Sequence, residues 1–442
     1  MRSIINNNSK NLNGLNSREL AIDILMDIIE VKSNPDQSLE KFLKQDKYNS
    51  LLKEDLAFCK IIIMTTLRRW GHIEIILSKY LKNSIEKHSR RIHIILFISI
   101  CQIIYLSNPA YAVVNIAINL TKRDRKSSKL SGLVNAILRK ISNEKDAILT
   151  QEMDSLELLP KWIRAKWSKV YNREELNQIS KTLLSDPPLD LSAKNNNQKI
   201  AEDLDGSLLS TGSIRLNKYS YIPSIKFYND GLWWVQDISA SIPIKLVEDN
   251  LKGKLFVDLC AAPGGKTANL LARGAIVTAV DKSLNRLKVL KDNLNRLDYK
   301  AVIVHADGTK WLPKNKVDGV LIDAPCSSTG VIRRNPDILL KEISNLDYFT
   351  QNQMNLLNNG INMLKKGGIL IYCTCSLEPE EGENQINKIL KDRKDILIRK
   401  INAERIPEFK KCVRKEGFMR IIPGVIPDGG NDGFFISILE KK

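Results

Sequence analysis

Two cysteines in the second half of this 442-residue chain stand where a nucleophile is expected. Cys326 lies in Asp323-Ala-Pro-Cys-Ser, Cys375 lies in Cys373-Thr-Cys-Ser, and both motifs follow apolar runs typical of buried strands. A thiolate can add to carbon 6 of a pyrimidine ring, and carbon 5 then becomes an enamine carbon that can accept a methyl group. A carboxylic acid at ring nitrogen 3, for which Asp323 is the candidate, would assist that addition. A second thiol could then remove the proton from carbon 5.

A loop of small residues follows the apolar run Leu255–Leu259. It reads Cys260-Ala-Ala-Pro-Gly-Gly-Lys266-Thr267 and leads into a helical stretch. A P-loop would need Gly at position 260, and a dinucleotide fingerprint would need G-x-G-x-x-G, so neither motif is complete. A nucleoside cofactor without a phosphate chain, namely S-adenosylmethionine, fits better, because small residues let the backbone approach a ligand.

Aspartates accompany four successive apolar runs. Asp281 lies 23 residues after Asp258, close to the spacing of a ribose-binding acid, and Asp307 and Asp323 follow the next two runs. Any one of them could be a helix cap. Together they favour a cofactor site, because open α/β sheets bind ligands at the carboxyl ends of their strands.

The elements that must position these residues form an alternating pattern. Strand-sized runs at 255–259, 276–280, 301–304, 319–322 and 368–372 are separated by helical stretches. This alternation predicts an α/β doubly wound, mostly parallel sheet over residues 246–442. Residues 146–245 contain Pro187-Pro188 and Asn195-Asn-Asn197, and they predict a linker with a small α+β middle segment.

The first part of the chain is helical in pattern. Apolar residues recur at three- and four-residue steps from Ser17 onward, which predicts an all-α bundle over residues 17–145 after a disordered, Asn-rich tail at 1–16. The apolar run Ile92–Leu106 is too short for a bilayer span and is interrupted by polar residues, so it predicts a buried helix.

Composition narrows the class of partner. The chain has 68 Lys and Arg against 50 Asp and Glu, a net charge of +18, and this surplus favours a polyanion such as nucleic acid. Seven cysteines without framework spacing suit a reducing compartment, and four scattered histidines give no metal site. The N-terminus lacks a signal peptide, so we expect a cytoplasmic protein without membrane or metal, acting as a monomer.

The motifs in their order resemble the RNA cytosine-C5 methyltransferases of the Nop2/Sun type. The resemblance covers residues 235–440 and includes Val331-Ile-Arg-Arg334-Asn-Pro336, Arg420-Ile-Ile-Pro423 and Asp432-Gly-Phe-Phe435. The N-terminal part is similar to the NusB-type RNA-binding domain in Asn108-Pro-Ala-Tyr-Ala-Val-Val-Asn115 and Gly132-Leu-Val-Asn-Ala-Ile-Leu-Arg139. This fusion of a NusB-like bundle with a Rossmann-like catalytic domain indicates the bacterial Sun type, which methylates 16S ribosomal RNA.

The resemblance also implies roles for individual residues. Cys375 would be the nucleophile, Cys326 would assist product release, and S-adenosylmethionine would be the methyl donor. The implied cofactor contacts are Cys260, Ala261, Ala262, Pro263, Gly264, Gly265, Lys266, Asp281, Asp307 and Asp323. Asn335 departs from the His that relatives commonly have, and Ser192 departs from their middle-segment Arg, which puts that RNA contact in doubt.

Two other functions remain open at this point. A DNA cytosine methyltransferase would use the Pro-Cys cysteine, Cys326, as its nucleophile. A non-catalytic RNA-binding or antitermination factor would need only the helical domain, although the four aspartates and both thiols argue against it.

Overall fold

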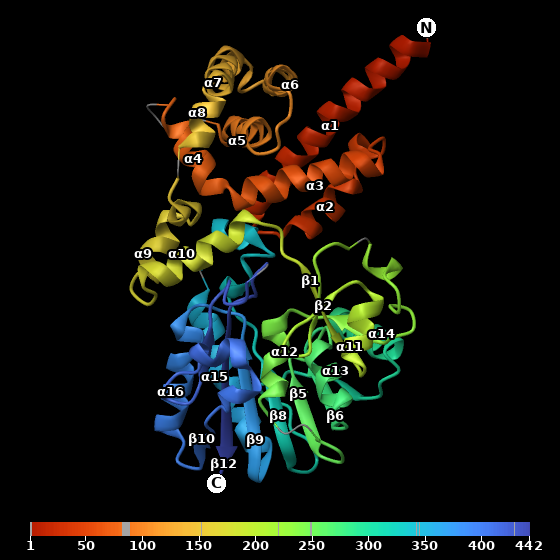
Figure 1. Ribbon diagram of the computed structural model, residues 1–442, viewed down its shortest axis with the longest axis vertical. Coiled ribbons are helices and arrows are strands. Elements are labelled where there is room, and N and C mark those ends of the chain that lie inside the picture. Colours follow the sequence, from red (N-terminus) through yellow and green to blue (C-terminus); the bar gives the residue numbers. More distant parts are fainter. Residues whose placement is uncertain are drawn as a thin grey trace. The chain divides into compact units, whose positions relative to one another are not determined.

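The computed structural model describes residues 2–81, 89–151, 153–219, 221–247, 250–341, 343, 345–427 and 429–442, with side chains from residue 14 onward. Two compact units make up the chain (Figure 1). Unit 1 holds Met1–Leu184 together with Asn335–Glu342, and unit 2 holds Ser185–Arg334 together with Ile343–Lys442. The chain therefore leaves unit 2 for a short segment directly after Arg334 and then returns to it.

Unit 1 is helical, as the sequence predicts. Its α-helices are α1 (Arg2–Val31), α2 (Pro35–Leu43), α3 (Lys53–Arg68), α4 (Trp70–Ser78), α5 (Arg90–Ile104), α6 (Ala110–Arg123), α7 (Ser131–Asn143), α8 (Lys145–Thr150), α9 (Lys161–Trp167) and α10 (Arg173–Lys181). Local capping fixes several of their starts: Asn34 accepts a hydrogen bond from the Gln37 amide, and Ser89 accepts one from the Ile92 amide.

The predicted buried helix is α5, whose residues from Ile92 to Ile104 are all buried in the core of unit 1. In the part of the chain that the structure describes, no helix is long and apolar enough to cross a membrane. The first helix differs from the prediction. The backbone of α1 begins at Arg2, so residues 2–16 of the segment predicted as a tail are helical, and no proline interrupts them.

The segment 146–184, predicted as part of the middle segment, is counted with unit 1 and contains α8 to α10. So is the short segment after Arg334, where the 3₁₀ helix Pro336–Leu340 places Leu340 against the helical core. Neither assignment can be read from local patterning, because both depend on packing between residues far apart in sequence.

Unit 2 is built on an eight-stranded sheet. Its strands are β5 (Leu255–Leu259), β6 (Ile276–Asp281), β7 (Val302–His305), β8 (Val317–Asp323), β9 (Leu364–Thr374), β10 (Ile396–Ile398), β11 (Met419–Ile421) and β12 (Phe434–Lys441). The order is β10-β12-β9-β8-β5-β6-β7, with β11 paired to β12. Strands β5 to β9 are parallel, and β12 runs antiparallel to β9. The five predicted strands correspond to β5 through β9.

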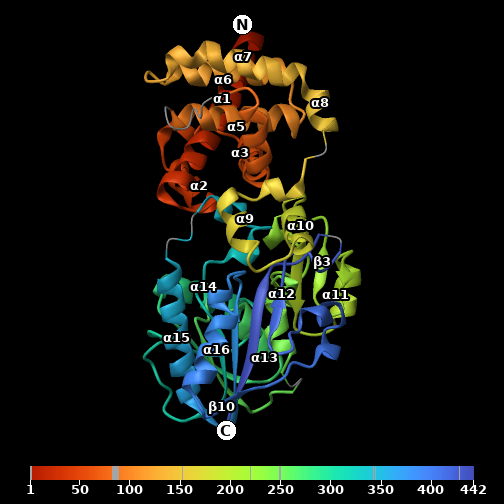
Figure 2. The same ribbon diagram turned by 90° about the vertical axis from the view of Figure 1, so that its left-hand side faces the viewer.

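Helices cover both faces of this sheet, which confirms the doubly wound architecture. They are α12 (Ile238–Lys245), α13 (Gly265–Ala272), α14 (Leu284–Arg296), α15 (Leu346–Met363) and α16 (Glu383–Asp392). Neighbouring strand residues point to opposite faces: Phe256 packs with α12 and α13, whereas Val257 packs with α15 and α16. Figure 2 shows α15 and α16 side by side. This arrangement leaves the carboxyl edge of the parallel strands for the loops.

The middle segment forms a small antiparallel sheet within unit 2. Its order is β2-β3-β1-β4, with β1 (Leu189–Ala193), β2 (Ser207–Leu208), β3 (Ile214–Leu216) and β4 (Trp233–Val235), and α11 (Asn197–Asp203) packs beside it. The buried Arg215 guanidinium binds both carboxylate oxygens of Asp190 at 2.8 Å and also donates to the Gly430 carbonyl at 2.7 Å. These bonds tie the small sheet to a loop of the catalytic sheet.

Candidate active site at the carboxyl edge of the sheet

The small-residue loop forms a tight turn between β5 and α13. Cys260 and Gly264 both have positive φ, at 64° and 103°, and the Gly264 amide donates to the Ala261 carbonyl at 2.8 Å. A residue with a Cβ is strained in this region of φ, so Gly suits position 264. Because of this turn, α13 begins at Gly265 on the edge of the sheet where the parallel strands end.

Asp281 joins this loop to the end of β6. One of its carboxylate oxygens accepts from the Ala262 amide at 3.2 Å, and the other accepts from the Ser283 amide at 2.9 Å. The Arg286 guanidinium lies 3.5 Å from the same carboxylate. The acid predicted to bind ribose therefore lies beside the predicted cofactor loop.

Lys266 points to the neighbouring strand end. Its ammonium lies 2.6 Å from an oxygen of Asp323, at the end of β8. Burial alone would lower the pKa of Lys266, but the Asp323 carboxylate raises it above the usual value. A P-loop lysine would be directed at phosphate, so this ion pair argues against the P-loop interpretation.

The other two acids differ in environment. Asp258 is buried within β5 and accepts from the Thr267 hydroxyl at 2.6 Å, and burial raises its pKa to about 7. Its second oxygen has no hydrogen-bond partner among the described residues. Asp307 is exposed, two residues past β7, and accepts from the Thr309 amide and hydroxyl at 2.9 and 2.7 Å, which lower its pKa.

The fold brings the side chains of the two predicted cysteines, Cys326 and Cys375, into contact. The sulfur atoms of Cys326, in the loop after β8, and Cys375, in the loop after β9, lie 3.5 Å apart. The Ser328 hydroxyl lies 3.5 Å from the sulfur of Cys375 and 3.9 Å from that of Cys326. All seven cysteines lie in the described part of the chain and are free thiols.

This thiol pair is electrostatically unequal. The hydrogen bond from the Cys326 thiol lowers the pKa of Cys375, and the contact with Ser328 lowers it further. The same hydrogen bond, together with burial, raises the pKa of Cys326 well above its usual value. Of the two thiols, Cys375 is therefore the one that ionises more readily. The neighbouring Cys373 is buried in the core, and burial raises its pKa.

The pair is held by a buried carboxylate that the sequence prediction missed. Glu381 accepts from the Ser327 amide at 3.0 Å, from Gln353 at 3.0 Å and from the Ser376 hydroxyl at 2.6 Å, and it also accepts from the Ser327 hydroxyl. It thus links the residue after Cys326 to the residue after Cys375. The only sequence signal is its place in Pro379-Glu-Glu-Gly382, six residues after Cys375.

A second network supports the loop after β8. The guanidinium of Arg333 lies 2.6 Å from Asp237 and 3.3 Å from Asp432, and that of Arg334 lies 2.5 Å from Asp432. Gly330 and Gly433 are in backbone contact, and a Cβ on Gly330 would lie 2.4 Å from the Gly433 carbonyl oxygen. The Gly330 amide also donates to the Cys375 carbonyl at 2.9 Å. The late motifs around 331–334 and 432–435 are therefore structural supports of the cysteine loops.

The residues at this edge suit S-adenosylmethionine. The turn at Gly264, the acid at the end of β6 and the buried Asp258 with one free oxygen all lie where the strand order reverses between β5 and β8. No group of three or more His, Cys, Asp or Glu residues could hold a metal ion within the described ranges. The sheet order and this loop are those expected of an S-adenosylmethionine-dependent methyltransferase.

Comparison with known proteins specifies the family. Residues 246–440 match the family described as 16S rRNA methyltransferase RsmB/F, and residues 15–143 match the NusB family. The chain is 31% identical over 428 residues to ribosomal RNA small subunit methyltransferase B of Photorhabdus laumondii, covering 92% of this chain and 95% of the relative. It is 28% identical to the protein of the same name from Pasteurella multocida, covering 100% and 99%. The chain belongs to the RsmB/F methyltransferase family.

Solved structures support the same fold. The crystal structure of PH0851 superposes with a TM-score of 0.71 at 21% identity and covers 97% of this chain and 99% of that one. The structure of NSun6 from Pyrococcus horikoshii with SFG gives a TM-score of 0.53 at 19% identity, over 64% of this chain and 98% of that one. The predicted fold, a NusB-like bundle with a Rossmann-like methyltransferase domain, is confirmed.

Proposed function

We propose that this protein methylates carbon 5 of a cytosine in 16S ribosomal RNA, with Cys375 as the nucleophile. The observation that carries the proposal is the pair of thiols 3.5 Å apart, of which Cys375 has the lowered pKa and Cys326 the raised one. Two thiols placed in this way suit a reaction that needs one thiolate to attack and one proton-transfer group beside it.

The Cys375 thiolate would add to carbon 6 of the base while a proton is delivered to ring nitrogen 3. Asp323 is our candidate for that delivery; its carboxyl group would have to be protonated for this step, so its ion pair with the Lys266 ammonium would give way when the base binds. The bond between sulfur and carbon 6 makes carbon 5 nucleophilic. The 260–266 loop, Asp281, Asp307 and Asp323 would hold S-adenosylmethionine, which when bound would supply the methyl group for carbon 5.

Release of the product would then depend on Cys326. Once Cys375 is bonded to carbon 6 it is no longer a thiolate, so the interaction that raises the pKa of Cys326 is lost. Cys326 can then lose its own thiol proton to solvent and, as a thiolate, accept the proton from carbon 5, after which the carbon–sulfur bond breaks and Cys375 leaves as a thiolate. Within one turnover, the thiolate is therefore first Cys375, which attacks the base, and then Cys326, which takes up the proton from carbon 5.

The parts of the chain outside the catalytic domain would bind the RNA. We propose that the helical domain (17–145) and the middle segment (146–245) contact it, consistent with a net charge of +18. A monomer acting in the cytoplasm would suffice, since both cysteines come from one chain.

The test is a methylation assay with the full-length protein, labelled S-adenosylmethionine and 16S ribosomal RNA, followed by nucleoside analysis. We expect label in 5-methylcytidine. Label in a different nucleoside would contradict the assignment of carbon 5 of cytosine. Label transferred only in a parallel reaction with DNA in place of RNA would favour a DNA cytosine methyltransferase. Absence of transfer with intact RNA binding would favour a non-catalytic RNA-binding factor.

A further inference from the structure

A cavity of about 280 Å³ lies between helices α6 and α7 of unit 1. The two helices pack against each other, as Figure 2 shows, and residues 124–130 join them. The lining includes three residues from the first half of α6 and three from the end of α7: Tyr111, Val114, Asn115, Arg139, Ser142 and Asn143. We call this cavity the hairpin groove.

An exposed aromatic ring lies at the hairpin groove. The side chain of Tyr111 is 75% exposed, whereas Val114, three residues further along α6, is buried. The phenol of Tyr111 makes no hydrogen bond to any residue that the structure describes. One exposed ring is ordinary on a protein surface. Here, however, the ring lies beside a cavity lined by polar side chains, so it offers a flat apolar surface next to hydrogen-bonding groups.

Those polar side chains are placed by helical spacing. Asn115 follows Tyr111 by four residues and Asn143 follows Arg139 by four residues, so each pair shares one helix face. The side-chain amides of Asn115 and Asn143 are exposed and have no hydrogen-bond partner within the described ranges. A side-chain amide offers both a donor and an acceptor, which is the combination that the edge of a nucleobase requires.

The charge of Arg139 is not neutralised locally. Its guanidinium donates to the side-chain oxygen of Asn135 at 2.9 Å, and no described carboxylate pairs with it. Arg91 of α5 differs, because it lies 2.7 Å from Asp23. No acidic residue lines the groove among those that the structure describes, and residues 110–143 hold seven Lys and Arg against one Asp. This balance favours an occupant with negative charge.

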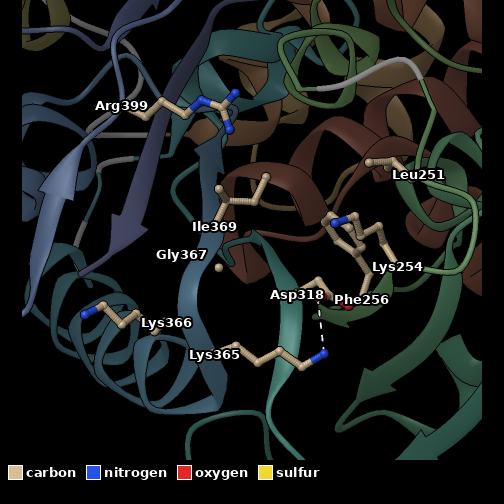
Figure 3. Close-up of a pocket in the computed structure, with 10 residues that line it drawn as sticks. Leu251, Lys254, Phe256, Asp318, Lys365, Lys366, Gly367, Ile369 and Arg399 are labelled. Atoms are coloured by element: carbon tan, nitrogen blue, oxygen red, sulfur yellow. Dashed lines mark hydrogen bonds and ion pairs between the residues drawn. The ribbon is translucent and has the colours of Figure 1, made fainter.

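A second basic cavity shows that charge alone does not define such a site. It has a volume of about 210 Å³ and lies in unit 2, where the parallel strands begin. Figure 3 shows that Lys365 pairs there with Asp318, at 3.2 Å. Its aromatic residue, Phe256, is buried in the core of unit 2 and cannot receive a base. The hairpin groove differs in having an exposed ring and an arginine without an acidic partner.

We propose that the hairpin groove binds one unstacked nucleotide of the substrate RNA, with its base on the ring of Tyr111. Asn115 and Asn143 would hydrogen-bond to the edge of this base, and Arg139 would bind a phosphate beside it. This inference rests on the proposed function, because it takes RNA as the substrate. The groove is slightly smaller than sites for drug-sized ligands, which are about 300–1,000 Å³, and so suits a single ring system.

Such a site selects unpaired RNA. Aromatic side chains hold the bases of single strands by stacking, whereas the bases of a duplex are already stacked and paired. The helical domain would therefore bind a single-stranded region of the ribosomal RNA and not a double helix.

The first experiment measures the affinity of the full-length protein for a fluorescein-labelled, 16-nucleotide single-stranded RNA at several salt concentrations. Tyr111→Ala should weaken binding at least about fivefold, the lower end of the cost of losing one stacked base. The slope of log affinity against log salt should not change, because no charge is removed. Tyr111→Phe keeps the ring and should bind as the parent does. The melting temperature should be the same in both variants, because Tyr111 is exposed.

Arg139→Gln should change the salt dependence instead. Loss of one phosphate contact should decrease the slope by about 0.7. The matched control is Lys366→Gln, which removes one lysine from the cavity of Figure 3 and should leave the slope unchanged. A duplex RNA of the same sequence should bind the parent and Tyr111→Ala equally, because its bases are not free to stack on the ring.

The second experiment locates the base. RNA with 5-iodouridine in place of uridine is irradiated in complex with the protein, and the crosslink is mapped by mass spectrometry; we expect it on the peptide that contains Tyr111. Parental affinity in Tyr111→Ala, or an equal loss in Tyr111→Phe, overturns the stacking assignment alone. Failure of the parent to bind RNA at all overturns the proposed function instead. If Tyr111→Ala keeps parental RNA affinity but loses binding to purified small-subunit ribosomal proteins, a protein occupies the groove and the RNA assignment is wrong.

Discussion

The loop after β8 and the loop after β9 present chemically identical thiols whose pKa values are shifted in opposite directions. Cys326 has a raised pKa and Cys375 a lowered one, although their sulfur atoms are 3.5 Å apart. Two thiolates at that distance would repel, so the first ionisation suppresses the second. The comparison teaches that residue type alone does not separate the two thiols, and that the roles we propose for them depend on the hydrogen bond between the loops.

The largest effect is expected from Cys375→Ala, which removes the proposed nucleophile. Methyl transfer should fall on the order of 10⁴-fold or more, because loss of a nucleophile removes the covalent route. The measurement is single-turnover methylation of 16S ribosomal RNA. Cys373→Ala, two residues away and buried, is the matched control and should retain transfer wherever the protein still folds. Parental rates in Cys375→Ala would show that the comparison assigns the wrong thiol.

Cys326→Ala should allow one methyl transfer and then stall, since no thiol remains to take the proton from carbon 5. Steady-state turnover should fall roughly 10²- to 10⁴-fold, the usual contribution of a general base. A band of protein covalently bound to RNA should persist on a denaturing gel. Stalled turnover without this adduct would contradict the release role of Cys326.

Asp323→Asn should lower the single-turnover rate by about 10²- to 10³-fold, a typical cost of removing one group that stabilises developing charge. The Lys266 ammonium would also lose its partner at 2.6 Å. Asp318→Asn is the control, because Asp318 pairs with a lysine at the opposite edge of the same sheet. If Asp323→Asn weakened S-adenosylmethionine binding and left the single-turnover rate intact, Asp323 would belong to the cofactor site alone.

Glu381→Ala tests what holds the two loops together. The Ser327 amide, Gln353 and the Ser376 hydroxyl would lose a buried acceptor, and unsatisfied buried groups cost about 1–3 kcal/mol. Chemical denaturation should show a loss of stability in this range. Glu380→Ala, the adjacent residue, is the control and should lose less. Equal losses in the two variants would mean that Glu381 has no special role in joining the loops.

The smallest expected effect is a shift of pH dependence. The hydrogen bond from Cys326 lowers the pKa of Cys375, so the Cys375 thiolate forms at a lower pH than an ordinary thiol does. Cys326→Ala removes that bond, and the rise of Cys375 alkylation with pH should move to higher pH. The measurement is the rate of iodoacetamide labelling of the Cys375 peptide at a series of pH values. An unmoved profile would show that the two thiols are not coupled.

Local patterning was sufficient to predict much of the catalytic domain. Strands β5 to β9 were predicted from apolar runs, because buried parallel strands are continuously hydrophobic. Asp281, Lys266 and Asp323 lie together because they follow neighbouring strands of one sheet. Topology therefore converts residues far apart in sequence into one site.

Other features depend on long-range packing and could not be predicted. Glu381 is one acid among many in sequence, and only the fold brings it to Ser327 and Ser376. The return of residues 335–342 to the helical unit leaves no local signal. The short strands β10 and β11 have three residues each and carry too little periodicity to be recognised.

The central claim is that Cys375, and not Cys326, attacks the base. The most direct measurement is to react the protein and S-adenosylmethionine with RNA containing 5-fluorocytosine, which has no removable proton at carbon 5. The covalent adduct is then mapped by mass spectrometry of the digested protein. We predict a nucleotide adduct on the peptide that contains Cys375. An adduct on the peptide that contains Cys326 would contradict the account.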